Sequence, residues 1–263
     1  MKKVTLHALK RDKDELLLSL QRCGELMVIS TEDSQPQEGF LQSSEALSRT
    51  QEALGFVNRS VGKRGMLTPR PEVEKTALLT VDPELEKLQH EVAQLERALS
   101  DNAAKESALV SEAASVAPWV PLDVPVEDLK NTKKVAVFTG SIAVNLLPAL
   151  SALAEEHESA VQPLGDGAEG KILVLYSPKD RADELLEAAK AMGYVPVTPP
   201  RITGLPSIRA ASLTAELEAV RQEGETLKES LKKLAEKRDE LEILLDQRAT
   251  EHERQSTPAT MTD

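Results

Sequence analysis

The sequence is poor in the residues from which large cores and ligand pockets are built. Only 2% of its 263 residues are aromatic: one Trp, two Tyr and three Phe. Aromatic side chains supply much of the buried area of large cores, and they line most small-molecule pockets. A single large globule and an enzyme with a deep pocket are therefore both disfavoured, and we expect no cofactor.

Cysteine and clustered histidine are also scarce. Cys23 is the one cysteine, which excludes a disulfide within the chain and a metal site built from cysteines. A lone thiol indicates a reducing compartment, and we expect Cys23 to be buried or a bystander. None of the four histidines has a second ligand at metal-binding spacing. We expect no metal site, and we predict a surface position for His7, His90, His157 and His252.

Excess positive charge and long apolar runs are missing as well. The net charge of −12 disfavours a protein whose main contact is a phosphate backbone, so no nucleic-acid partner is expected. Charged residues interrupt the N-terminal MKKVTLHALKRDKDE before an apolar segment can form, so no signal peptide is predicted. No stretch approaches the ~20 apolar residues of a transmembrane helix. We therefore expect a cytoplasmic chain without a membrane span of its own.

What the sequence does contain is two long stretches of heptad periodicity. In the first, over 83–117, apolar residues alternate at spacings of three and four. In the second, over 207–250, ten positions step 4-3-4-3, and all but Gly224 and Arg238 are apolar. A long helix must bury such a stripe, so the two stretches are predicted to pair as an antiparallel coiled coil. The predicted seam consists of Leu85, Leu88, Val92, Leu95, Leu99, Leu213, Leu217, Val220, Leu227, Leu231, Leu234, Leu241 and Leu245.

Two segments have the pattern of small strand–helix–strand units. The first occupies 3–30, with strands predicted at 4–8 and 26–29 around a short helix. It is too small to bury its own core, and a further helix is predicted near 42–58. In the second unit, strands are predicted at 133–138, 171–176 and 194–197, with helices at 142–156 and 178–192. Ser177 is predicted to cap the last helix and Gly193 to end it.

These patterns predict an α+β protein with two small α/β lobes of βαβ, ferredoxin-like type, joined by the coiled coil into a dumbbell. The expected divisions are a proximal lobe at 1–60, a linker at 61–82, the outgoing helix at 83–117, the distal lobe at 118–206, the return helix at 207–250 and a disordered tail at 251–263. Trp119 is predicted to pack the joint between arm and distal lobe. Its alternative role is a partner contact, where Trp is enriched.

Two glycine-bearing segments match phosphate sites only in part. Residues 165–171 have the Gly-x4-Gly-Lys spacing, but Ile172 stands where a Ser or Thr hydroxyl is needed, and the loop leads into a strand. A turn is the favoured interpretation. Thr139, Gly140 and Ser141 are predicted to lie between a strand and a helix, where an anion could bind, although a helix cap is commoner. No catalytic residue is assigned.

The segment PWVPLDVPVEDL at 118–129 is similar to the start of the distal lobe in subunit I of V/A-type ATPases. Subunit I is the prokaryotic counterpart of the V-ATPase a subunit. The opening strand MKKVTLHAL, the helix with Leu-Gln-Arg-Cys-Gly and the Val-Ile strand that follows resemble the beginning of that subunit. The later order of strands and helices also matches, so the resemblance covers about residues 1–250.

The resemblance implies a non-catalytic stator arm at the cytoplasmic face of the membrane. In that family the arm engages the peripheral-stalk heterodimers and connects them to the membrane sector, which moves protons or sodium ions. Compared with the family, this sequence lacks the membrane half with its buried Arg and the second part of the proximal lobe. A split, frameshifted or truncated sequence would show this, as would a protein that assembles with a separate membrane partner. We expect the 3–30 unit to be less stable than the 120–200 lobe.

Two other functions remain open from the sequence. A generic coiled-coil tether or scaffold unrelated to ATPases would share the heptads but would not need a βαβ unit at both ends. An enzyme or a ligand-binding regulator would require a pocket with convergent polar groups in the 120–200 lobe. The sequence offers only Gly140, Ser141 and the 165–171 loop for such a pocket.

Overall fold

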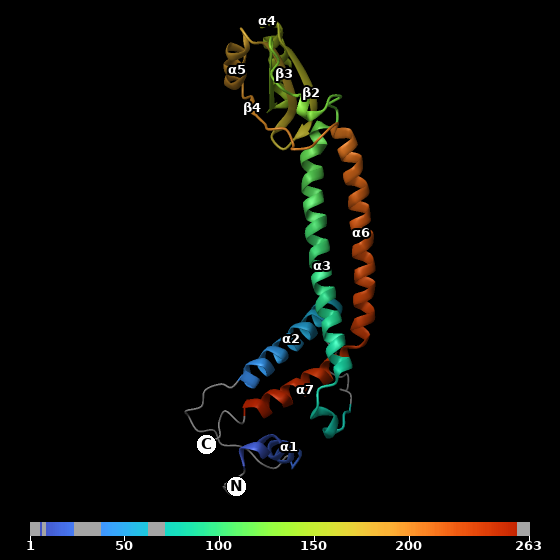
Figure 1. Ribbon diagram of the computed structural model, residues 1–263. Coiled ribbons are helices and arrows are strands. Elements are labelled where there is room, and N and C mark those ends of the chain that lie inside the picture. The colour runs from blue at the N-terminus through green and yellow to red at the C-terminus, as the bar shows by residue number, and fades with distance from the viewer. Residues whose placement is uncertain (1–5, 7–8, 24–37, 63–71, 257–263) are drawn as a thin grey trace. The chain divides into compact units, whose positions relative to one another are not determined.

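The computed structural model describes residues 6, 9–23, 38–62 and 72–256. These residues contain seven α-helices and one four-stranded antiparallel sheet, so the predicted α+β class is confirmed (Figure 1). The chain divides into two compact units. One is the continuous segment 102–224, and the other combines residues from 1–101 with residues from 225–263. No helix among the described residues has both the length and the apolar content needed to cross a membrane.

The unit at 102–224 is built on a sheet whose order is β2-β3-β1-β4, with every neighbouring pair antiparallel. Its strands are β1 (Val135–Ile142), β2 (Ala160–Gly167), β3 (Gly170–Pro178) and β4 (Val195–Pro196). Helix α4 (Leu147–Glu156) connects β1 to β2, and α5 (Ala182–Ala191) connects β3 to β4. Each helix thus joins two strands with a third between them. This is the ferredoxin-like arrangement predicted for the lobe.

Both faces of the central strand β3 are buried. Leu173 and Leu175 lie in a cluster with Leu150 of α4 and Ala189 of α5. On the opposite face, Ile172, Val174 and Tyr176 pack in a cluster with Trp119 and Leu122. A strand covered on both sides needs an uninterrupted apolar run, which explains why 171–176 was readable from the sequence.

The local boundaries in this unit differ from the predictions at several places, among them the start of α5, which lies at Ala182 and not at 178. Strand β2 was not predicted, because Gln162, Pro163 and two glycines interrupt its apolar pattern. Strand β1 continues to Ile142, and a short 3₁₀ helix at Val144–Leu146 precedes α4. Ser177 is not a helix cap: it belongs to β3 and its buried hydroxyl bonds to Ser159. Gly193, with φ of 96°, does follow the end of α5 as predicted.

The second unit is helical in its described part. It contains α1 (Lys13–Cys23), α2 (Glu38–Val61), the first part of α3 (Pro83–Val116), the last part of α6 (Pro206–Glu236) and α7 (Arg238–Ser256). A short 3₁₀ helix spans Lys75–Leu78. The core of this second unit joins Ala53 and Val57 of α2 to Leu88 and Val92 of α3 and to Leu241 of α7.

The predicted return helix at 207–250 and the predicted tail at 251–263 both need correction. The helix is interrupted at Lys237, whose N–H bonds to Leu234 O in a tightened turn, and α7 then continues to Ser256. Residues 251–256 are therefore helical. The sequence around Lys237 has no Gly or Pro to signal this break. Its physical cause is packing, because Leu241 and Leu244 of α7 are completely buried.

The predictions for the N-terminal unit are tested only in part. Its expected strands at 4–8 and 26–29 lie outside the described residues, apart from Leu6. The helix expected between them corresponds to α1. The helix expected near 42–58 corresponds to α2, which begins four residues earlier and ends three residues later.

Candidate functional site

Within residues 102–224, charged side chains join α3 and α6 in antiparallel sense. The Nε atom of Arg209 donates to Glu112 at 2.8 Å, and that of Arg221 donates to Glu106 at 2.8 Å. Later residues of α6 thus meet earlier residues of α3. The hydrogen bond to Glu112 raises the pKa of Arg209 above its usual range. These pairs are partly or largely exposed, so they orient the helices more than they stabilise them.

A buried polar contact lies between the same helices. The Nδ2 atom of Asn102 donates to the backbone carbonyl of Val220 at 3.0 Å. Asn102 is 7% exposed, and it lies against Gly224, which is also buried. The sequence patterns did not single out this pair.

The seam continues in α3 beyond the residues that the sequence assigned to it. Counting on from Leu99 at alternating spacings of three and four gives positions that are buried or partly buried: Asn102, Glu106, Leu109, Ala113 and Val116. Because two of them are polar and one is Ala, the apolar pattern faded there. Extending the spacing without regard to residue type would have found them.

The predicted seam residues fall into two groups by exposure. Six are buried: Leu88, Val92, Leu95, Leu213, Leu231 and Leu241. The other seven are partly buried: Leu85, Leu99, Leu217, Val220, Leu227, Leu234 and Leu245. Leu88, Val92 and Leu241 share their cluster with α2, a contact that the heptad pattern does not reveal.

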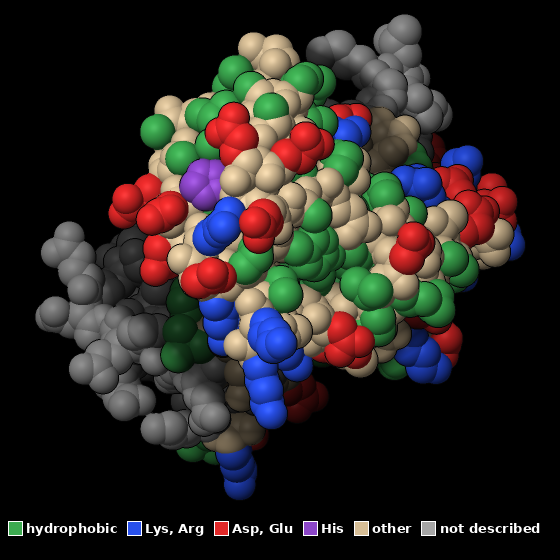
Figure 2. Space-filling model, turned by 90° about the horizontal axis from the view of Figure 1, so that it is seen from above, with side chains coloured by type: hydrophobic (Ala, Val, Ile, Leu, Met, Phe, Trp, Pro, Cys, Tyr) green, Lys and Arg blue, Asp and Glu red, His purple; other side chains and the backbone are tan. Residues whose placement is uncertain are grey.

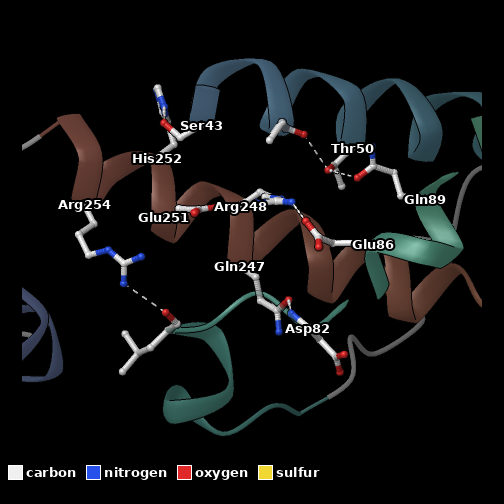
Figure 3. Close-up of polar contacts among 12 residues, drawn as sticks. Ser43, Thr50, Asp82, Glu86, Gln89, Gln247, Arg248, Glu251, His252 and Arg254 are labelled. Carbon is white, nitrogen blue, oxygen red and sulfur yellow. Dashed lines mark hydrogen bonds and ion pairs between the residues drawn. The ribbon is translucent and has the colours of Figure 1, made fainter. Parts of the chain in front are cut away.

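Polar contacts around α7 attach it to the segment before α3 (Figure 3). The amide of Gln247, which is 4% exposed, donates to Ala77 O at 2.9 Å and accepts from the N–H of Asp82 at 3.1 Å. Arg248 pairs with Glu86 of α3 and, at 2.7 Å, with Glu251 of its own helix. Gln247 and the terminal nitrogens of Arg248 bind other protein groups, so the cluster is suited to holding helices together.

A serine and a histidine meet where α2 faces the end of α7 (Figure 3). Ser43 Oγ lies 3.1 Å from His252 Nδ1, and it donates a hydrogen bond to Phe40 O at 2.9 Å. The His252 ring lies 4.8 Å from the ring of Phe40. Because the single hydroxyl hydrogen of Ser43 goes to a carbonyl, the imidazole is the donor in this pair. The geometry is that of a packing contact and not of a nucleophile with its base.

The structure does not support the candidate anion site at 139–141. Ser141 is 3% exposed and lies inside β1, paired with Ile172 and Val195. A Cβ at Gly140 would lie 2.3 Å from Cζ of Tyr194, so the glycine makes room for that ring. Both the favoured helix cap and the alternative anion site at these residues are wrong, because the strand continues past them and no helix begins there.

The segment 165–171 contains the end of β2, a turn at 168–169 and the start of β3, so the favoured interpretation of a turn before a strand is confirmed. The ammonium group of Lys171 pairs with Asp166 at 3.0 Å. The lysine that a phosphate loop would need is therefore engaged with a carboxylate, and the residues after it form a strand.

Trp119 lies in the cluster on the face of the sheet opposite α4 and α5. It is 2% exposed, between the end of α3 and the 3₁₀ helix at Val126–Asp128. A buried indole offers little surface to a partner.

A hollow of about 320 Å³ lies beside β1, between α5 and β4. Its lining residues are Val137, Phe138, Thr139, Leu186, Lys190, Tyr194, Pro196, Val197, Thr198 and Pro199. Burial raises the pKa of Tyr194 well above its ordinary value, so its hydroxyl stays protonated. With Lys190 as the one other ionisable group, the lining holds no acid–base pair for catalysis.

The remaining candidates are scattered. Cys23 is exposed, so the prediction of a buried thiol is wrong and the bystander alternative remains. His90 is exposed, His157 and His252 are partly buried, and His7 lies outside the described residues. Across 6, 9–23, 38–62 and 72–256, no three His, Cys, Asp or Glu side chains come together as metal ligands would.

Apolar and charged side chains are mixed on the face of the molecule that Figure 2 shows. Two exposed apolar residues lie elsewhere, at the end of the sheet where β1 ends and β4 begins. Val144, after β1, is 62% exposed, and Val195 of β4 is 46% exposed. They lie near one another, because Val195 pairs with Ser141, three residues before Val144. Two exposed valines therefore lie close together at this end of the sheet.

Comparison with known proteins gives a structural likeness. The chain is similar to a solved structure of the cytoplasmic N-terminal domain of subunit I, the homolog of subunit a, of V-ATPase. The match covers 95% of this chain and 87% of that one, with 15% identity and a TM-score of 0.46. No protein-family model matches the sequence, and no curated protein matches it significantly. The subunit named by this match is the one that the sequence resembles at 118–129.

Proposed function

We propose that this chain is the cytoplasmic stator arm of a rotary V/A-type ATPase, a non-catalytic subunit that links peripheral stalks to the membrane sector. The observation that carries the proposal is the antiparallel pairing of α3 with α6, two helices of 34 and 31 residues, next to a ferredoxin-like sheet. The segment that leads from α3 into that sheet is the one that resembles subunit I in sequence.

A stator arm must transmit torque without bending, and a pair of long helices is suited to this task. At ~1.5 Å per residue, α3 alone extends about 50 Å. Ion pairs and the Asn102 contact join it to α6 along the part within residues 102–224. We propose that the thirteen predicted seam residues continue this pairing as a coiled coil between two lobes, in a dumbbell, and that Trp119 packs the joint with the distal lobe.

The proposed division of the chain follows the structure where it differs from the heptad pattern. The distal lobe and the adjoining helix halves are the continuous unit 102–224, and the proximal lobe includes α2 and α7. The return arm is α6, while α7 belongs to the proximal lobe, because Leu241 packs with Ala53 and Val57 of α2.

The proposed partners are the peripheral-stalk heterodimers and the membrane sector of the ATPase, at the cytoplasmic face of the membrane. The apolar surface around Val144 and Val195 is the proposed contact for a stalk. The arm supports proton or sodium transport by holding the stationary parts in place, and it takes no part in ion transfer itself.

Binding to a purified peripheral-stalk heterodimer of the host tests this function. Isothermal titration of the full chain should show a complex. Val144→Glu combined with Val195→Glu should weaken it at least about tenfold, because each adds an unpaired charge to apolar contact surface. Val110→Glu is the matched control, since Val110 is 45% exposed on α3, outside the proposed contact. Absence of any complex with the parent chain would contradict the stator function and favour a tether or scaffold unrelated to ATPases.

A further inference from the structure

One buried polar residue interrupts the apolar contact between α3 and α6. Asn102 occupies the seam position that follows Leu95 and Leu99, and it is 7% exposed. Its Nδ2 atom donates to the Val220 carbonyl at 3.0 Å. A buried amide needs hydrogen-bond partners in its surroundings, so Asn102 is acceptable only where the facing helix offers an acceptor within reach.

Gly224 is what brings that acceptor within reach. A Cβ added at this position would lie 2.8 Å from Asn102 Oδ1, so any other residue would displace the amide. Glycine is unfavourable inside a helix compared with alanine, and Gly224 lies well inside α6. Close approach of the Asn102 amide to the backbone of α6 explains its place there.

We propose that Asn102 and Gly224 form a register lock that fixes the axial alignment of α3 and α6. Apart from Glu106, which pairs with Arg221, the neighbouring seam positions hold Leu, Val and Ala, which can pack in more than one heptad alignment. A slip of seven residues, about 10 Å along the axis, would place Leu217 or Leu231 opposite Asn102. Either leucine would fill the space left by Gly224 and keep the amide from any carbonyl. An unpartnered buried amide disfavours the slipped alignment roughly five- to a hundredfold in population.

Within residues 102–224, the Asn102–Gly224 contact lies at the end of the helix pair that the sheet does not hold in place. Near the sheet, the hydrogen bond from Arg209 to Glu112 holds the two helices together. Asn102 and Gly224 lie at the opposite limit of the unit. Between the two ends a helix can absorb a slip by a local change of winding, so the connection at the sheet does not by itself fix the alignment at Asn102. This inference does not depend on the proposed function.

Distance measurement between spin labels tests the lock in the full chain. Labels are attached to cysteines that replace Ser111 and Gln222, which are exposed on α3 and α6, after Cys23→Ser removes the native thiol. The parent should give a single distance between the two labels in pulsed electron–electron double resonance. Asn102→Leu should add a second population whose axial offset differs by about 10 Å, because leucine packs in either alignment.

Ser107→Leu is the matched control, since it makes a similar change at an exposed position of α3, and it should leave the single distance unchanged. Asn102→Ala removes the amide without adding bulk and should also produce the second population. If both Asn102 variants keep the single distance of the parent, the alignment is set elsewhere and the proposal is overturned.

Discussion

The identity of residue 140 is determined by a side chain far along the sequence, that of Tyr194. The backbone of Gly140 lies against the ring of Tyr194, which is 3% exposed and fixed in the core between the sheet and its helices. A buried ring that packs in a core cannot move far enough to admit another carbon atom without strain. Glycine at this position is therefore a packing requirement.

Replacing Gly140 with Ala should destabilise the chain by about 1–3 kcal/mol, the range for overpacking a core. The added Cβ would lie 2.3 Å from Cζ of Tyr194. Urea unfolding of Gly140→Ala measures the loss. In a Tyr194→Leu background the same substitution should cost much less, because the ring is gone. Equal losses in both backgrounds would contradict the packing explanation.

At the residue scale, the sequence shows that a ligand site is missing more readily than it shows which residues contact each other. Thr139, Gly140 and Ser141 have the composition of an anion loop, and nothing near them in the sequence points to Tyr194. The failed phosphate loop was different, since Ile172 and the strand after it were visible locally. Asn102 was not noticed because a polar residue weakens the apolar pattern that identifies a seam.

The helix pair α3 and α6 owes part of its geometry to ionised side chains. Arg209 bonds to Glu112 on the facing helix and to Glu216 on its own. Hydrogen bonds from Ser212 and then from Arg209 hold the pKa of Glu216 below its ordinary value of 4.5. A carboxyl with a lowered pKa stabilises the folded state above its unfolded pKa, and this contribution disappears as the pH falls through the lowered value.

The chain should therefore lose stability below about pH 4.5, and Glu216→Gln should lose less over the same interval. Thermal unfolding of both proteins at pH 7 and at successive values down to pH 3 gives the comparison. Glu229→Gln, an exposed change on the same helix, is the control and should follow the parent. Parallel curves for the parent and Glu216→Gln would count against the role of this carboxyl.

At the element scale, repeating patterns were readable and irregular ones were not. The heptads predicted α3 and α6, and the apolar run at 171–176 predicted β3. Strand β2 lies at the sheet edge and contains Pro163, so it has no continuous apolar pattern. The break at Lys237 follows from the packing of α7, and such tertiary contacts leave no local signal.

The two compact units of the whole molecule differ in how their cores are covered. In 102–224, β3 is buried on both faces, with Leu173, Val174 and Leu175 fully inaccessible. In the other unit, the described core is a contact among helices, each exposed on its outer side. Local opening is rarest where the backbone is covered on both sides.

Hydrogen exchange on the full chain should accordingly find its slowest amides in β3. Amides of α7 should exchange faster, and those at 3–30 faster than those of the 120–200 lobe. Mass spectrometry of peptides from each region measures the rates. Equal protection in 3–30 and 120–200 would contradict the expected difference in stability, and α7 as slow as β3 would contradict the role of two-sided burial.

One unit is a continuous segment of the chain and the other is made of two separate segments, so the two units become complete at different times during synthesis. Residues 102–224 follow one another, so this unit is complete as soon as its last helix half has emerged from the ribosome. Val57 on α2, by contrast, must wait for Leu241, roughly 180 residues later. At ~5–20 residues per second the wait is about ten to forty seconds. Throughout that interval the apolar stripe of α2 lacks its α7 partner, and the sheet domain is completed only near its end. The newborn chain is therefore exposed to aggregation through α2 during most of its synthesis.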